Sequence, residues 1–187
     1  MTETFMPGFR RYPDEAAIIG RLLAGYGELE FEMCRCVEAA MNDFDAAFKL
    51  IFARQGERKR IERADTVMRP KYNAVGIDTD YETTIGGMDH CRRIRNQYAH
   101  STWYDTKPEG LCILNLEDTA KLATPVTSVV SNRRSIDVAL LRRQEDFFGY
   151  IQLSFWHLHW AYDTAMKRPT AIDYQMPAAI TPPPLHN

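Results

Sequence analysis

An arginine, an asparagine and a histidine stand close together in the segment Arg92–Ser101, which reads RRIRNQYAHS. His100 is suited to moving a proton, because histidine is the side chain whose ordinary pKa lies nearest neutrality. Arg95 carries a permanent charge on a planar fork that can hold a phosphate and stabilise the transition state. Asn96 could orient the imidazole or bind a phosphate oxygen. These side chains predict metal-independent RNA cleavage, in which the neighbouring 2′-hydroxyl attacks the phosphate and the 5′-oxygen leaves.

Helical spacing gives this segment one apolar and one polar face. Residues four apart share a side of a helix, so Arg92, Asn96 and His100 form a polar stripe, flanked by Arg93 and Arg95. Arg95 and His100 are about 140° apart on an ideal helix, so we expect another group to complete the site. That group is RNA, an acidic residue from elsewhere in the chain, or a second copy of the chain. Arg92 and Arg93 are predicted to contact RNA phosphates. The opposite, buried arc comprises Gly87, Cys91, Ile94, Tyr98 and Ser101.

Helices are predicted to position these side chains. Apolar residues recur at spacings of three, four and seven over residues 14–42 and again over residues 135–168, which predicts two long helices. At 1.5 Å per residue the second would be on the order of 45 Å long. Further helices are predicted over residues 43–54, over residues 57–69 with Pro70 ending the helix, and from a start between Tyr81 and Asp89 through the motif.

The residue composition changes after the motif helix. Gly110–Leu116 and Lys121–Ser131 are short, β-branched or apolar, and separated by turn residues, so they predict a small β-hairpin. We therefore expect an all-α fold: a single bundle of four to five helices over residues 1–168, with this hairpin inserted before the long last helix. The proline-rich segment 169–187 is predicted to be an extended or disordered tail.

Composition restricts the class of protein. The 187 residues include 23 Lys and Arg against 25 Asp and Glu, a net charge of −2, so any contact with RNA must be local. Four cysteines are too few for a disulfide scaffold, and no apolar run is long enough to span a membrane. The N-terminal residues lack the apolar run of a secretory signal. A cytoplasmic protein without membrane association is expected.

Other chemical signals are weaker. His157 and His159 in WHLHW point about 160° apart on a helix, so they are not expected to share a metal ion. Cys34 and Cys36 lack partners at zinc spacing and are interpreted as small buried residues. The sequence has no Gly-rich phosphate loop, Gly-x-Ser-x-Gly elbow or His-Glu-x-x-His motif. Neither a cofactor nor a metal is therefore predicted.

Arg95, Asn96 and His100 resemble the signature of the HEPN superfamily (higher eukaryotes and prokaryotes nucleotide-binding domains). That signature is an arginine, usually followed by a polar residue, and a histidine after four to six intervening residues. A long first helix, a motif helix in mid-chain and a long last helix are similar to its layout. The resemblance implies a homodimer through the motif helix, whose paired motifs form a metal-free endoribonuclease cleft. It also implies a toxin or antiviral-defence effector, with an antitoxin or defence-complex protein as partner.

The same resemblance leaves alternatives open. Some members of the superfamily have lost catalysis and bind nucleotide, RNA or protein, and a structural subunit of a defence complex is a third reading. One subgroup carries a tyrosine, modified by nucleotide transfer, two residues after the histidine. That position is Thr102 here, which argues against control by that route. In several similar families an early acidic residue holds the motif arginine. Glu30 is expected to play this part, as a structural ion pair rather than a proton-transfer group.

Overall fold

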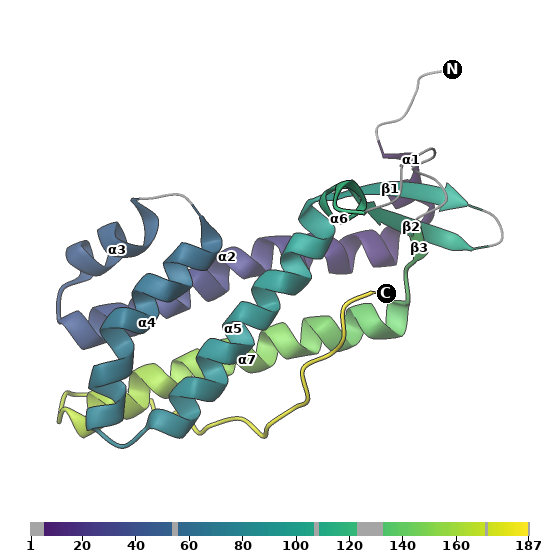
Figure 1. Ribbon diagram of the computed structural model, residues 1–187. Helices are drawn as coiled ribbons and strands as arrows, with labels where there is room; N and C mark the ends of the chain where they lie inside the picture. The colour runs from purple at the N-terminus through teal and green to yellow at the C-terminus, as the bar shows by residue number, and fades with distance from the viewer. Residues whose placement is uncertain (1–5, 54–55, 107–108, 123–132, 171, 187) are drawn as a thin grey trace. The chain divides into compact units, whose positions relative to one another are not determined.

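In this computed structural model, residues 6–53, 56–106, 109–122, 133–170 and 172–186 are described. The chain is predominantly helical, as expected, and its small β-sheet lies in sequence between the motif helix and the last helix (Figure 1). No helix in these ranges is both long and apolar enough to cross a bilayer. The helices are α1 (Pro7–Arg11), α2 (Pro13–Met41), α3 (Phe44–Phe52), α4 (Glu57–Ala74), α5 (Asp78–Ala99), α6 (Leu116–Ala120) and α7 (Val138–Ala165).

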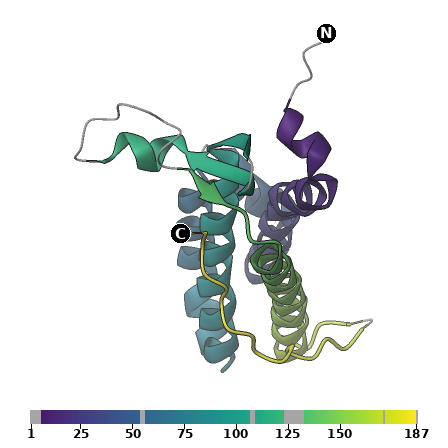
Figure 2. The same ribbon diagram turned by 90° about the vertical axis from the view of Figure 1, so that its right-hand side faces the viewer.

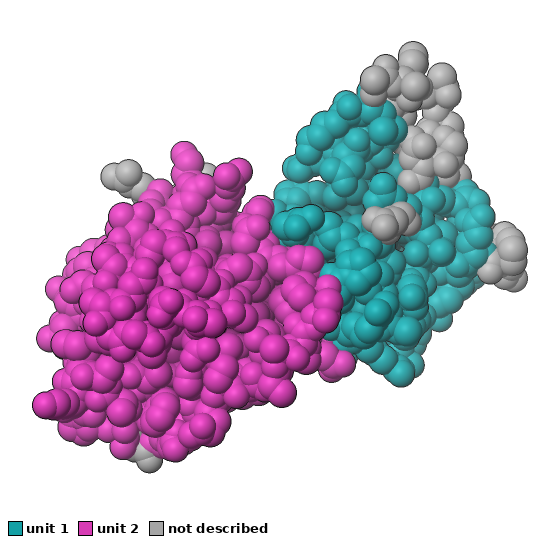
Figure 3. Space-filling view, turned by 60° about the horizontal axis from the view of Figure 1, so that its bottom comes forward, with its two compact units in different colours: residues 1–24, 93–145, 183–187 teal, residues 25–92, 146–182 magenta. Residues whose placement is uncertain are grey.

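The chain groups into two compact units, each built from stretches that are distant in sequence (Figure 3). Unit 1 contains residues 1–24, 93–145 and 183–187, and unit 2 contains residues 25–92 and 146–182. The three long helices α2, α5 and α7 each contribute residues to both units. The expectation of a single helical domain over residues 1–168 stays a prediction.

Local signals explain most helix boundaries. The two long helices predicted over residues 14–42 and 135–168 correspond to α2 and α7. Asp43 begins α3 as its N-cap, because its side chain accepts a hydrogen bond from the N–H of Ala46 at 3.0 Å. The helix predicted over residues 43–54 is thus confirmed over Phe44–Phe52, and Arg54 lies outside the described residues.

Helix α4 continues through Pro70 to Ala74, so the prediction that Pro70 ends the helix is wrong. Proline inside a helix costs about 3 kcal/mol, because it removes a hydrogen bond and crowds the preceding turn. The next turn is anchored by Tyr72, which is fully buried and donates to the carbonyl of Cys36 at 3.2 Å. Tyr72 also stacks on Tyr162, with ring centroids 4.7 Å apart. Packing in unit 2 therefore outweighs the local cost of the proline.

The motif helix α5 begins at Asp78, earlier than predicted. The turn before it is short, and Gly76 takes the positive φ of 76° that this turn requires. Asp78 and Asp80 stand in the first helical turn, where carboxylates are stabilised by the positive end of the helix dipole. Tyr81 then packs into unit 2, fully buried, and donates to Asp65 at 2.5 Å.

The sheet contains β1 (Ser101–Thr106), β2 (Gly110–Asn115) and β3 (Arg134–Ser135) in antiparallel order β1-β2-β3. Its partner strands differ from the prediction, because β2 pairs with the segment directly after the motif helix rather than with Lys121–Ser131. Residues 123–131 lie outside the described residues, and Lys121 and Leu122 follow α6 without forming a strand. Figure 1 and Figure 2 show α6 beside the strands, in contact with β2.

Unit 1 adds two features that the sequence did not predict. Helix α1 packs against β1, where Phe9 and Trp103 meet edge to face with ring centroids 4.8 Å apart and Arg11 forms an ion pair with Asp105. Residues 172–186 form neither helix nor strand, in agreement with the expected tail, yet His186 near the end of the chain is only 4% exposed. The tail is thus anchored at its far end.

Candidate functional site

The buried arc of the motif helix is confirmed. Cys91 and Ile94 are fully buried and Tyr98 is 1% exposed, while Gly87 is buried as well. Ser101 is half-buried and opens β1. Because these residues fix the rotation of α5, the polar stripe on its other side is turned away from the core. Along that stripe Arg92 and Asn96 are half-buried and His100 is exposed.

Arg95 and Asn96 are brought together by the structure. Nη1 of Arg95 donates to Oδ1 of Asn96 at 3.0 Å, and both side chains are half-buried. The asparagine therefore orients the guanidinium, whereas the sequence predicted that it orients the imidazole or binds a phosphate oxygen. With Oδ1 engaged in this way, the amide Nδ2 is the part of Asn96 that can donate to a phosphate oxygen.

His100 is the first residue beyond α5, and both its backbone N–H and its backbone carbonyl form hydrogen bonds. Its N–H donates to the carbonyl of Asn96 at 3.3 Å, and its own carbonyl accepts from the N–H of Leu116 at 3.2 Å. The side chain is 43% exposed, with Nδ1 at 3.4 Å from Oε1 of Glu117. A carboxylate on this side favours the tautomer that carries its proton on Nδ1. Within the described residues Nε2 has no hydrogen-bond partner, so it is the nitrogen that can meet a substrate.

Glu117 is the residue that sequence reasoning missed. It lies in the first turn of α6, whose N-cap Asn115 accepts a hydrogen bond from the N–H of Asp118 at 3.0 Å. It reaches His100 because the β1–β2 register pairs Ser101 with Asn115, so the residues just outside this pair are neighbours. A hairpin predicted with a different partner strand could not reveal this contact.

The two arginines predicted to contact RNA phosphates differ in their surroundings. Arg92 is 18% exposed and forms an ion pair with Asp89 on its own helix, with Nη2 at 2.8 Å from Oδ1. Arg93 is exposed and forms no ion pair within the described part of the chain. Of these two arginines, Arg93 therefore has the guanidinium that is more accessible to a phosphate.

Glu30 is buried in unit 2, 5% exposed, and forms an ion pair with Arg60 of α4 across 2.6 Å. Its expected contact with an arginine of the motif helix stays a prediction. Arg60 also lies over the ring of Phe52 at 5.5 Å. In the same unit Nε of Arg60, Nη1 of Arg63 and the hydroxyl of Tyr26 are buried without a hydrogen-bond partner among the described residues. Such unpaired buried donors cost free energy.

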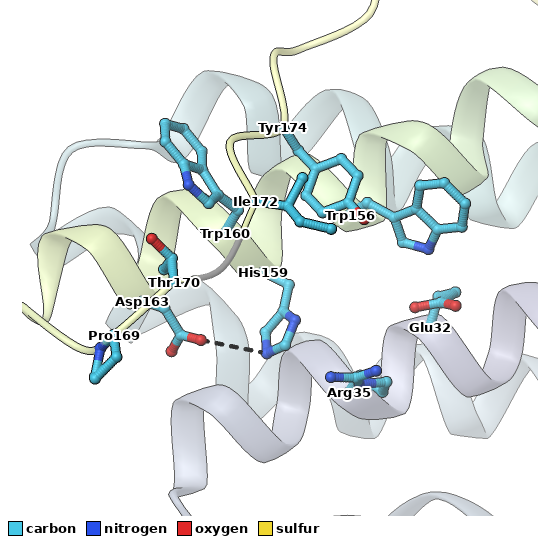
Figure 4. A pocket seen from close by; sticks show the side chains of 10 residues that line it. All are labelled: Glu32, Arg35, Trp156, His159, Trp160, Asp163, Pro169, Thr170, Ile172 and Tyr174. Atoms are coloured by element: carbon cyan, nitrogen blue, oxygen red, sulfur yellow. Dashed lines mark ion pairs between the residues drawn. The ribbon is translucent and has the colours of Figure 1, made fainter.

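Unit 2 also contains a pocket of about 480 Å³ (Figure 4). Trp156 and Tyr174 form an aromatic corner on it, with ring centroids 5.5 Å apart and planes inclined at 52°. His159 points down between Asp163 and Arg35, with Nε2 at 3.5 Å from Oδ2 of Asp163 (Figure 4). Burial lowers the pKa of His159, although the Asp163 carboxylate opposes this shift. Burial therefore favours the neutral form of the imidazole.

The pocket was not predicted, because WHLHW was considered as a possible metal site and its tryptophans were interpreted as bundle core or interface. Phe155 and Leu158 do belong to the core, whereas Trp156 and Trp160 are half-buried and line the pocket. His157 is separate from His159 in its contacts: Nδ1 lies 2.7 Å from the carbonyl of Tyr174 and Nε2 lies 3.1 Å from Oδ2 of Asp80. These contacts hold the segment that closes one side of the pocket.

The four cysteines take no part in either site. All are buried and none forms a disulfide, which confirms the interpretation of Cys34 and Cys36 as small buried residues. Burial raises the pKa of the Cys34 thiol to about 11. Neither thiol is therefore poised to act as a nucleophile at neutral pH.

Comparison with known protein families, curated proteins and solved structures finds no match to this chain. The resemblance to the HEPN superfamily therefore stays a prediction, based on the motif and the order of the helices alone. Two places in the molecule carry side chains suited to chemistry or binding: the end of α5 in unit 1 and the pocket in unit 2.

Proposed function

We propose that this protein is a metal-independent endoribonuclease, with Arg95 and His100 as its catalytic residues. The observation that carries the proposal is the setting of His100 at the exposed end of α5. Its Nδ1 lies 3.4 Å from the Glu117 carboxylate, while Nε2 has no partner among the described residues. This arrangement resembles that of a general base, whose distal nitrogen accepts a proton while a carboxylate orients the ring.

In the proposed reaction Nε2 of His100 takes the proton of the RNA 2′-hydroxyl as its oxygen attacks the adjacent phosphorus. The bond to the 5′-oxygen breaks, leaving a 2′,3′-cyclic phosphate and, after a proton is supplied, a 5′-hydroxyl. Arg95, oriented by Asn96, stabilises the negative charge that builds up on the phosphate oxygens. Arg93 and Arg92 contribute positive charge along the RNA strand.

The proton balance of this reaction favours a homodimer. One neutral histidine can accept the first proton but cannot at the same moment donate one to the departing oxygen. Two copies of the chain meeting through the motif helix would place two histidines at one cleft, one as base and one as acid. On this proposal the protein acts as a toxin or antiviral-defence effector, and an antitoxin or defence-complex protein restrains it.

The deciding experiment uses purified protein and a labelled RNA in the presence of a chelator. We expect cleavage with cyclic phosphate ends, no cleavage at a position that carries a 2′-deoxy substitution, and a loss of at least about 100-fold in His100→Ala. Light scattering on the same sample measures the oligomeric state. Cleavage by His100→Ala at the parent rate, in a variant with the parent's unfolding midpoint, contradicts the proposal.

A catalytically silent binding module is the second candidate, and the pocket in unit 2 favours it. The corner formed by Trp156 and Tyr174 offers aromatic faces for a base, and Arg35 offers a charge for a phosphate. The chain has 3 tryptophans, two of which line this pocket, so their fluorescence can report binding. Quenching by a nucleotide that Arg35→Ala abolishes, without any RNA cleavage, would establish this function instead.

A further inference from the structure

The segment Pro183–His186 is held in unit 1 by side chains that bond its backbone. Gln97 bonds His186 twice: Nε2 donates to the His186 carbonyl at 2.6 Å, and Oε1 accepts from its N–H at 3.0 Å. Nη1 of Arg134 donates to the same carbonyl at 3.1 Å. Nε2 of Gln144 donates to the carbonyl two residues earlier at 2.9 Å. This is the pattern by which a groove recognises an extended peptide, and here the peptide is part of the chain.

The imidazole of His186 has a donor on one side and an acceptor on the other. The N–H of Asp137 donates to Nε2 at 3.0 Å, so Nε2 carries a lone pair and the ring proton is on Nδ1. Nδ1 in turn donates to the hydroxyl oxygen of Tyr98 at 2.9 Å. That hydroxyl donates to Oε1 of Gln144, whose amide nitrogen holds the tail. The neutral form of His186 therefore sets the direction of every hydrogen bond in the network.

A second proton on His186 is incompatible with this network. It would sit on Nε2 and face the N–H of Asp137, replacing a hydrogen bond with two opposed donors. Among the described residues, the charged groups around the ring are the Asp137 carboxylate and the Arg134 guanidinium, while Tyr98 and the two glutamines are neutral. Burial lowers the pKa of His186, and the backbone and carboxylate of Asp137 together offset this only in part.

We propose that unit 1 carries a docking groove for the chain's own C-terminal segment, and that acid releases the segment by adding the second proton to His186. The docked form binds fewer protons, so docking is complete above the ordinary histidine pKa near 6.5. As pH falls from 6.5 toward the lower pKa of docked His186, the equilibrium constant for docking decreases by up to about tenfold per pH unit. Gln97 and Tyr98 lie in α5 between Asn96 and His100. The docked segment therefore restrains the same turn that carries the motif.

Amide hydrogen exchange of the full-length protein, followed by NMR, tests this proposal. The protection factor of the His186 amide, whose N–H bonds Gln97, should fall by up to about tenfold between pH 7.5 and pH 5.5. The Ile136 amide, which donates to the carbonyl of Leu111 at 2.8 Å in the same unit, serves as the internal reference and should keep its protection. Imidazole nitrogen shifts at pH 7.5 should show the proton of His186 on Nδ1.

Three variants separate protonation from loss of structure. Glutamine can accept from Asp137 and donate to Tyr98 but takes up no proton, so His186→Gln should keep the tail protected at pH 5.5. His186→Ala should lose protection at both pH values. His159→Gln removes the buried histidine of unit 2 and should leave the acid response of the tail unchanged. The proposal is wrong if the tail amide stays protected at pH 5.5, if the ring proton is on Nε2, or if His186→Gln releases like the parent.

Discussion

The carboxylate of Glu117 lies 3.4 Å from Nδ1 of His100, although one residue follows the motif helix and the other lies in the first turn of α6. If His100 is the base of a ribonuclease, this contact orients its ring. We expect Glu117→Gln to lower the cleavage rate about tenfold, less than the 10²- to 10⁴-fold effect of a general base. The unfolding midpoint should be nearly unchanged, because an exposed ion pair contributes at most about 1 kcal/mol.

Asp118→Asn is the matched control for that variant. Asp118 is the next carboxylate along α6 and pairs with Lys121 across 3.8 Å rather than with the histidine. The two rates are compared on one RNA at several pH values. Equal rates in the two variants would show that Glu117 has no positioning role.

Arg93→Ala tests whether the exposed end of the motif helix contacts RNA. Loss of one phosphate contact should weaken RNA binding and reduce the slope of log K against log salt by about 0.7 for a single strand. Fluorescence anisotropy over a series of salt concentrations measures both quantities. Arg143→Ala removes another exposed arginine of unit 1, from α7, and should leave the slope unchanged. A similar change in both variants would indicate only a general effect of charge.

Gly87 permits a close approach of α5 and α7 in unit 2. A Cβ at this position would lie 2.1 Å from Cδ1 of Ile151 and 3.0 Å from its Cγ1. Gly87→Ala should therefore destabilise the protein by about 1–3 kcal/mol in urea unfolding. Gly86→Ala is the control, because nothing lies within 4 Å of its Cβ and alanine is the better helix former. It should stabilise by about 0.5–1 kcal/mol. Ile151→Ala should relieve part of the Gly87→Ala defect.

Glu30→Gln tests the buried ion pair of unit 2. Without the carboxylate charge, the half-buried guanidinium of Arg60 loses its charged partner, so the free energy of unfolding should fall by about 1–3 kcal/mol. Glu28→Gln neutralises an exposed carboxylate of the same helix and should change stability by less than about 0.5 kcal/mol. Chemical unfolding of both variants measures the difference. No difference between them would mean that the pair is not structural.

Acid should weaken unit 2 through His159. The pKa of this imidazole is lowered by burial, so the folded state binds fewer protons than the unfolded state. Its contribution to stability is complete above the ordinary histidine pKa near 6.5 and is lost as pH falls through the lower folded pKa. His159→Gln should flatten the fall in unfolding free energy between pH 7 and pH 5. An unaltered pH dependence would show that His159 is not responsible.

Local periodicity was enough to predict the longer helices and the face of α5 on which the motif lies, but not the short helices α1 and α6. Cys91, Ile94 and Tyr98 are buried where a helical wheel places them, because that pattern depends only on rotation about one axis. The same periodicity concealed β1, since Ser101 continues the buried arc although the helix ends at Ala99. Local sequence cannot tell whether a continuing pattern belongs to the helix or to the strand after it.

Contacts between segments that are distant in the chain could not be predicted from local sequence patterns. Glu117 approaches His100 only through strand pairing, and α4 passes Pro70 only because Tyr72 packs on Tyr162. The proline-rich composition of the tail predicted an extended arm. It gave no indication that Gln97 would bind His186. Each of these outcomes depends on which remote partner is available, a property that local sequence patterns do not contain.

The pairing of Ser101 with Asn115 has a consequence for how related sequences can differ in length. A residue inserted into β1 alone would shift every pair beyond it and carry α6, with Glu117, away from His100. An equal insertion into β2 would restore the match. Among relatives that keep this histidine–glutamate contact, the lengths of the two strands should therefore vary together, so that an addition to one is accompanied by an addition to the other.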